Sequence, residues 1–363
     1  MNLRDKLNNT LNFKNCTADS GAVLETFFPW GLTVENFISE GLPSEYLKIL
    51  DDMSENNPQS VTQYFDIKMT ESIAEYESYF GFDKMYRMHF QPPFSCVHSY
   101  GEKPPVVCMS DWEKIKAEAE KTINKYHTDE NIKKIYSAYS QGHKNGEFSI
   151  RFAIKGFFWL PRDLFGVEEH MIALYDEPEI LHDINSYMCD YYIKYLDKIF
   201  DYIVPDVFYI MEDLSGANGP MISPAHFSEY LGFYYKKLIP FLKAKGVGHV
   251  FVDTDGDFNM LIPDFIECGV EGFLPMDFNA GMDIEKVREE YPRLKLIGAF
   301  NKLVIREGKE SIDKEFERLL PVIKQGGYVP SCDHQAAPDS TLENYMYYAK
   351  KLREVMKHSG ENL

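Results

Sequence analysis

From about residue 150 onward, short apolar runs alternate with longer amphipathic stretches, and this rhythm constrains the fold more than any other feature. The runs are rich in Val, Ile and Phe, as buried strands are. They cover residues 148–159, 206–213, 249–256, 270–278, 294–301 and 327–334. The stretches with a helical pattern include residues 224–245, 258–268, 283–291, 311–324 and 341–357. Strands and helices that alternate at this spacing predict parallel strands joined by right-handed crossovers.

Two upstream segments, 22–28 and 84–90, are the best candidates for two further strands. With them the sequence predicts an α/β fold of the (β/α)8 TIM-barrel type. An open doubly wound sheet is the structural rival, but the sequence contains neither a GxGxxG nor a GxxxxGKS phosphate-binding turn. The length fits a single barrel domain over 1–363, with a less regular N-terminal helical extension over 1–80.

Two other upstream stretches have a local pattern. Residues 29–43 predict a helix that is entered after a proline and ended by Gly-Leu-Pro. Residues 89–104 are rich in proline and aromatic residues and predict a loop over the barrel mouth or a short subdomain.

Composition and charge narrow the classes of partner. Hydrophobic residues make up 44% of the chain, which is enough for a large core. The formal net charge of -19 argues against nucleic acid and against an anionic membrane surface as partners. No segment approaches the roughly 20 apolar residues that span a bilayer. The polar N-terminus and the scattered cysteines, which include no CxxC pair, predict a cytoplasmic protein.

Polar residues follow several of the later predicted strands at the point where each strand ends. In a barrel of this type, the C-terminal strand ends form the catalytic face. A carboxylate left at the end of an apolar strand is paired, solvated or functional. The residues at these ends are Glu212, Asp213, Asp253, Asp255, Asp277, Asn301, Cys332, Asp333 and His334.

Asp253 and Asp255 are the most informative of these residues. Side chains two positions apart share a face of a strand, so both carboxylates are predicted to point into the barrel mouth. Two neighbouring like charges raise one pKa or require a cation, a hydrogen-bond donor or a basic ligand group. The alternative is a turn in which these carboxylates only cap backbone N–H groups. Together with His334 and Cys332, the pair could bind a divalent metal such as zinc or hold the substrate directly.

The run over 148–159 ends at Trp159 and leads into Arg162 and Asp163. Arg162 could bind a carboxylate or phosphate of a ligand. The alternatives are an ion pair with Asp163 or a helix cap.

Several segments resemble the uroporphyrinogen decarboxylase-like superfamily of (β/α)8 barrels, which includes the tetrapyrrole decarboxylase and cobalamin-dependent methyltransferases. The resemblance runs through most of the chain, and the methyltransferase-like members are closest in pattern. It is strongest over residues 218–230, 234–246, 252–283, 296–302 and 326–345.

The resemblance implies a place for the active site. The methyltransferases of the superfamily hold zinc with a His-x-Cys pair on the fifth strand and a Cys on the eighth. Those positions correspond here to Asp253, Asp255 and His334, so the positions match while the ligand types differ. The decarboxylase has a paired-arginine motif near its N-terminus, and here Arg4 is followed by no arginine before Arg87. Decarboxylation of a porphyrinogen is therefore not expected.

The function that the resemblance implies is transfer of a methyl group between a small methylated substrate and a corrinoid cofactor. The cofactor would be carried by a separate corrinoid protein, because the chain lacks the Asp-x-His-x-x-Gly signature. Asp253, Asp255 and His334 would bind a metal or polarise the methylated heteroatom, and Arg162 would orient an acidic group. The residues expected to line the substrate pocket are Trp159, Glu212, Asp213, Asp277 and Asn301. A decarboxylase or lyase acting on another acid and a non-catalytic ligand-binding barrel remain as alternatives, and a homodimer remains open.

Overall fold

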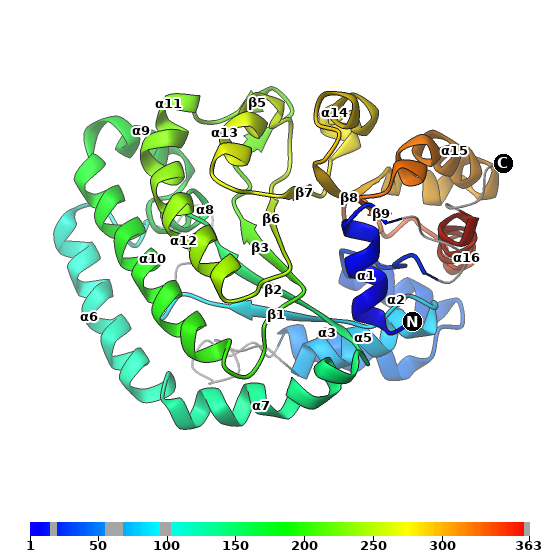
Figure 1. The fold of residues 1–363 in the computed structure, drawn as a ribbon, viewed down its shortest axis with the longest axis horizontal. Helices are drawn as coiled ribbons and strands as arrows, with labels where there is room; N and C mark the ends of the chain where they lie inside the picture. Colours follow the sequence, from blue (N-terminus) through cyan, green and yellow to red (C-terminus); the bar gives the residue numbers. More distant parts are fainter. Residues whose placement is uncertain (15–19, 55–67, 95–102, 359–363) are drawn as a thin grey trace.

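The computed structural model describes residues 1–14, 20–54, 68–94 and 103–358. Its centre is a curled sheet of seven strands, all parallel, in the order β1-β2-β3-β6-β7-β8-β9 (Figure 1). These strands are β1 (Met85–Phe90), β2 (Ser149–Lys155), β3 (Val207–Met211), β6 (His249–Asp253), β7 (Gly272–Leu274), β8 (Lys295–Phe300) and β9 (Tyr328–Cys332). A small antiparallel pair, β4 (Ser215–Gly216) and β5 (Gly219–Pro220), follows β3. The α/β barrel-type fold predicted from the alternating runs is confirmed.

Helices surround the sheet and connect its strands (Figure 1). The helices that precede β2 are α1 (Leu3–Leu11), α2 (Gly31–Ser39), α3 (Leu47–Ser54), α5 (Lys68–Tyr79), α6 (Met109–Tyr126) and α7 (Asp129–Asn145). Those between β2 and β6 are α8 (Trp159–Phe165), α9 (Val167–Asp176), α10 (Pro178–Ile199), α11 (Pro224–His226) and α12 (Phe233–Ala244). The later ones are α13 (Ile262–Glu267), α14 (Ile284–Glu290), α15 (Lys309–Gln325) and α16 (Leu342–His358). Within the described part, no helix is both long and apolar enough to cross a membrane.

Alternate side chains of the strands fill the inside of the barrel, as the two-residue period of a strand requires. The buried inner cluster takes one or more residues from each of the seven strands and also includes Leu24 from the 22–28 segment. Its strand residues are Met85, Ala153, Val207, Tyr209, Phe251, Leu274, Ile297 and Val329. The intervening side chains, such as Phe152, Ile210 and Val252, pack outward against the helices in the larger core.

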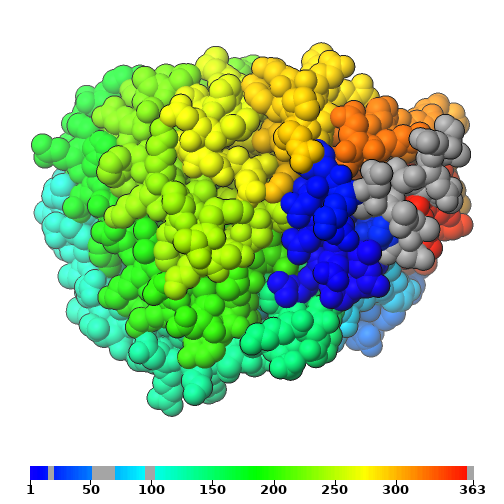
Figure 2. Space-filling view, viewed as in Figure 1, coloured from blue at the N-terminus to red at the C-terminus, as the bar shows by residue number. Residues whose placement is uncertain are grey.

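Helix α1 covers the N-terminal end of the barrel. Leu7 and Leu11 extend the inner cluster, and Arg4 forms an ion pair of 2.8 Å with Asp206 just before β3. Asn8 contacts His249 at the start of β6, and the carbonyl of Thr10 accepts from the N–H of Gly327. Figure 2 shows α1, in blue, packed on this end of the molecule. Among the described residues, α1 therefore covers the end of the barrel at which the strands begin.

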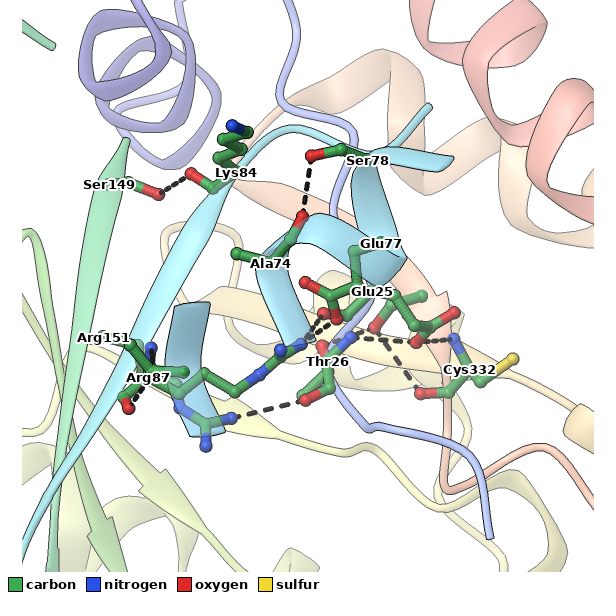
Figure 3. Close-up of polar contacts among 12 residues, drawn as sticks. Glu25, Thr26, Ala74, Glu77, Ser78, Lys84, Arg87, Ser149, Arg151 and Cys332 are labelled. Carbon is green, nitrogen blue, oxygen red and sulfur yellow. Dashed lines mark hydrogen bonds and ion pairs between the residues drawn. The ribbon is translucent and has the colours of Figure 1, made fainter. Parts of the chain in front are cut away.

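The 22–28 segment was predicted to be a strand, and this is wrong. The segment does lie between β9 and β1, where an eighth strand would stand, but side chains take the place of a backbone ladder (Figure 3). The carbonyls of Glu25 and Thr26 accept from Arg87 and Arg151, at 2.6 and 3.3 Å. The Glu25 carboxylate accepts from the N–H of Cys332 at 3.2 Å. The side chains of Arg87 and Arg151 therefore donate hydrogen bonds to backbone carbonyls of the 22–28 segment. In a paired strand, backbone N–H groups of β1 would donate to these carbonyls.

Most predicted helices are present with shifted ends. The 224–245 stretch is divided into α11, a π-helical turn over Phe227–Gly232 and α12. The helix predicted over 29–43 is shorter and forms α2. The loop predicted over 89–104 begins after Phe90, where β1 ends, and its centre falls outside the described residues.

Candidate functional site

The described residues enclose a cavity of about 470 Å³ at the C-terminal end of the barrel. Its wall is formed by the ends of β1, β2, β3 and β6, the loop after β9, the residues that lead into α2, and α5. The lining residues are Thr26, Phe27, Phe28, Pro29, Trp30, Gly31, Thr70, Ile73, Arg87, His89, Arg151, Trp159, Met211, Asp213, Asp253, Asp255, His334 and Gln335. This size suits a small organic ligand. The cavity lies where the fold class led us to expect the active site.

Asp253 lies at the end of β6, on the inner face of the barrel. It is two residues beyond Phe251 of the inner cluster, and its neighbour in register on β3 is Met211. Burial raises the pKa of the Asp253 carboxyl to about 7, Arg151 lowers it in part, and Asp255 adds to the increase. An acid with this pKa carries a proton for much of the time near neutral pH and can donate it to a ligand.

His334 and Asp255 face each other across the cavity mouth. The Nε2 atom of His334 lies 3.4 Å from Oδ2 of Asp255. The backbone N–H of Gln335 donates to Nδ1 at 3.0 Å, so in the neutral ring the proton is on Nε2, toward Asp255. Phe27 and Trp30 stack on the imidazole, with centroid distances of 5.1 and 6.5 Å. These contacts hold the ring in one orientation at the rim of the cavity.

Asp213 and Trp159, two of the predicted substrate-binding residues, also line the cavity, and both contact Arg162. The Arg162 guanidinium donates to the Asp213 carboxylate at 3.0 Å and to the Asp213 carbonyl at 2.5 Å. It also lies 5.2 Å from the centroid of a Trp159 ring. The alternative partner, Asp163, forms its ion pair with Lys155. Arg162 thus supports one wall of the site, and its predicted role as a clamp for a ligand anion receives no geometric support.

Glu212 is buried on the other face of β3 and is not among the residues that line the cavity. Its carboxylate accepts from the backbone N–H groups of Phe157, Phe158 and Trp159 and from the Tyr235 hydroxyl. Burial raises its pKa to about 7, and these hydrogen bonds oppose the increase. Glu212 therefore holds the turn that begins α8 in place. This structural role accounts for a carboxylate at the end of β3, and no bound ligand is needed to explain it.

Asp277 and Asn301 are likewise absent from the cavity lining. The Asp277 carboxylate accepts from the N–H groups of Asn279 and Ala280, and the Asn301 side chain accepts from the N–H of Leu303. Both side chains cap short 3-10 helices, Phe278–Ala280 and Lys302–Glu307. Side chains that only cap backbone N–H groups were the alternative for Asp253 and Asp255. In the structure, this description fits Asp277 and Asn301.

Cys332 does not join Asp253, Asp255 and His334. Its side chain is buried beside Glu25 and Tyr348, and this burial raises the pKa of the thiol well above its usual value. A neutral, buried thiol is a poor metal ligand. Among the described residues, no three His, Cys, Asp or Glu side chains are arranged to hold a metal ion. The predicted residues therefore do not fit a zinc site.

The structure adds three basic residues that were not predicted as site residues. Arg87 and His89 of β1 and Arg151 of β2 line the cavity, and Arg87 and Arg151 are partners in the parallel register. A signal was present, because each arginine interrupts an otherwise apolar strand, in the segments MYRMHF and SIRFAIK. A charged residue on the inner face of a barrel strand needs a partner or a ligand.

The chain matches the family model described as uroporphyrinogen decarboxylase (URO-D) over residues 99–355. Among solved structures it is similar to a methyltransferase from Methanosarcina mazei, with 17% identity, 98% of each chain covered and a TM-score of 0.59. A putative vitamin-B12 independent methionine synthase from Listeria monocytogenes is more distant, with 12% identity, a TM-score of 0.39 and coverage of 96% and 98%. No curated protein matches the sequence. The family model covers well over half of the chain, which therefore belongs to the uroporphyrinogen decarboxylase family.

Proposed function

We propose that this protein is a methyltransferase-type enzyme that moves a methyl group from a small methylated substrate to a corrinoid carried by a partner protein. The observation that carries the proposal is the convergence of Asp253, Asp255 and His334 on one cavity at the barrel mouth. By the resemblance given above, these positions correspond to the zinc ligands of the superfamily's methyltransferases. The barrel shared with the Methanosarcina mazei methyltransferase over 98% of the chain supports the same reading.

The chain's own residues suggest how the substrate would be activated without zinc. When a methyl group leaves an oxygen, nitrogen or sulfur atom, the bonding electron pair remains on that atom, which then needs a proton. Asp253 has a pKa of about 7 and lies in the cavity wall, so it can supply this proton. The Nε2–H of His334 can donate a hydrogen bond to the same atom, because Gln335 occupies Nδ1. The corrinoid would supply the cobalt that accepts the methyl group.

The aromatic rim gives the site an apolar entrance. Trp30 is 51% exposed, and Phe27, which also lines the cavity, stacks on the His334 ring. Aromatic rings exclude water from the reacting centre and offer a surface to a flat cofactor. The corrinoid-bearing partner would dock at this open end, since α1 covers the opposite one.

A decarboxylase acting on another acid is the second candidate. Arg87 and Arg151 favour it, because guanidinium groups bind carboxylates and Asp253 could protonate the carbon that loses carbon dioxide. The Arg162 clamp expected for such an acid is instead occupied by Asp213.

The test is to incubate the purified protein with free cob(I)alamin and a panel of methyl ethers, methylamines and methylthiols. The proposal expects the absorption spectrum of methylcobalamin with at least one substrate. Asp253→Asn should form methylcobalamin far more slowly, while Asp257→Asn should not, because Asp257 caps the following turn and does not line the cavity. Release of carbon dioxide from a carboxylic acid, without methylcobalamin from any substrate, would replace the proposal by the decarboxylase.

A further inference from the structure

We infer that Arg87 and Arg151 form a subsite for a carboxylate, so the substrate carries a carboxylate at the end opposite its methylated atom. The inference rests on the proposed function for the identity of the methylated end. The subsite itself rests on the geometry of the two arginines, which neither the family match nor the similar structures assign.

The sheet brings the two arginines together. They are register partners on the neighbouring parallel strands β1 and β2, so both side chains leave the sheet on its inner face. Each is only 7% exposed, and both line the cavity. Figure 3 shows both side chains extending toward Glu25 and Thr26. Two guanidinium groups so close together repel each other, and burial increases this cost.

The hydrogen bonds of the pair are incomplete. Arg87 forms an ion pair with Glu77 and donates to the carbonyl of Glu25. Arg151 donates to the carbonyl of Thr26 and to Nε2 of His89. Nε and Nη1 of Arg87 and Nε of Arg151 are buried with no hydrogen-bond partner among the described residues. Unpartnered buried donors are rare and costly in folded proteins, so they point to a missing acceptor.

The counter-charges do not balance the pair. Among the described residues, Arg151 forms no ion pair, and the carboxylates of Glu77 and Asp253 act on it only from beyond ion-pair distance. A Tyr209 ring lies beside its guanidinium group, with the ring centroid at 5.0 Å. Burial keeps His89 neutral, with a pKa of about 3, so it accepts from Arg151 and adds no charge. Burial also raises the pKa of Glu25 to about 7, which weakens its negative charge near Arg87. Of the two arginines, therefore, only Arg87 has a carboxylate at ion-pair distance among the described residues.

The charge distribution favours a singly charged carboxylate over a phosphate. Asp213, Asp253 and Asp255 line the same cavity and would repel a dianion. Two planar guanidinium groups match the two oxygens of a carboxylate. A carboxylate bound at the arginines also sets the direction of the substrate, because its other end then faces Asp253 and His334.

The experiment compares two pairs of probes by titration calorimetry. Methoxyacetate is paired with 2-methoxyethanol, and (methylthio)acetate with 2-(methylthio)ethanol. In each pair, the first compound carries a carboxylate where the second carries a hydroxymethyl group. We expect the wild type to bind the acids at least about tenfold more tightly than the alcohols. Arg151→Gln should remove this preference and leave the affinity for the alcohols unchanged. Arg293→Gln is the matched control, since Arg293 is exposed before β8, at the closed end of the barrel.

A purely structural role for Arg151 would weaken acid and alcohol alike, or neither, so it cannot imitate the loss of preference. Arg87→Lys provides a second variant that keeps a positive charge beside Glu77 and should reduce the preference in part. Equal affinity of the wild type for acid and alcohol, or an unchanged preference in Arg151→Gln, would overturn the subsite. Failure of methyl transfer together with an intact carboxylate preference would overturn the proposed function alone.

Discussion

The Nε2 atom of His334, beyond the end of β9, lies 3.4 Å from Oδ2 of Asp255, beyond the end of β6. The two residues are far apart in the chain and meet because the curled parallel sheet brings the C-terminal ends of its strands to one mouth. The stacked rings of Phe27 and Trp30 keep the imidazole in reach of Asp255. This contact joins two of the residues on which the proposed reaction depends.

Replacement of His334 tests its part in the reaction. His334→Ala should lower kcat/KM by about 10²-fold or more, because the hydrogen-bond donor at the reacting atom is lost. The melting temperature should change little, since the side chain is partly exposed at the cavity rim. His182→Ala is the matched control, because His182 is also partly exposed and contacts one carboxylate, that of Glu229. Equal activity of wild type and His334→Ala would remove His334 from the mechanism.

The activity should depend on the protonation of Asp253. If this residue donates the proton, kcat/KM should fall as the pH rises above about 7, the pKa of its carboxyl in the ligand-free protein. Asp253→Asn cannot donate, so its residual activity should lack this decline. Steady-state rates measured from pH 5.5 to 9 would show the difference. A wild-type profile that stays flat through pH 7 would exclude Asp253 as the proton donor.

The same carboxyl should make the free energy of unfolding depend on pH. Its pKa is 3.8 in the unfolded chain and about 7 in the folded protein, so the folded state binds the proton more tightly. The resulting stabilisation is complete below pH 3.8 and is lost as the pH rises through about 7. Relative to the wild type, Asp253→Asn should therefore become more stable as the pH rises from 4 to 8. Urea unfolding at several pH values measures this trend, and a constant difference would contradict it.

Gly156 should not tolerate a side chain. A Cβ atom at this position would lie 2.2 Å from the carboxyl of Glu212, which holds the backbone of the turn that starts α8. Gly156→Ala should lower the free energy of unfolding by about 3 kcal/mol, because it displaces a buried, hydrogen-bonded carboxylate. Gly216→Ala is the control, since nothing lies within 4 Å of its added Cβ. Similar denaturation midpoints for the two variants would show that the turn can adjust.

The purified protein should contain little zinc. Because the side chains of the cavity do not form a ligand group and Cys332 is buried elsewhere, protein purified without chelator should contain zinc far below one atom per chain. Elemental analysis of wild type and Asp253→Ala measures this. A stoichiometric amount in the wild type that disappears in the variant would restore the metal site.

The alternating apolar runs were sufficient to predict the barrel, since the period of two and the spacing of the crossovers are local properties of the chain. They also predict that Asp253 and Asp255 share a face, because the two residues are two positions apart, and in the structure both line the cavity. The same alternation contained a signal that the prediction did not use. Tyr209 points inward, so Glu212 belongs to the outer face of β3 and Asp213 to the inner one.

Other features depended on which strands are neighbours. In the chain, Arg87 and Arg151 are separated by a segment that includes α6 and α7, and the register of β1 against β2 places them side by side. The 22–28 segment has the composition of a strand, but the guanidinium groups of these arginines occupy its carbonyls.

The sequence by itself determined the fold class and the end of the barrel at which the site lies, because hydrophobic periodicity acts over short distances along the chain. The tertiary structure alone decided which polar strand ends face the cavity. The side chains of Asp277 and Asn301 cap backbone N–H groups of the turns that follow them, whereas the Asp253 carboxyl accepts from no backbone N–H group of the described residues and lines the cavity. Whether a polar side chain caps the backbone or lines the cavity depends on the turn that follows its strand. The geometry of that turn is set by packing between segments far apart in the chain.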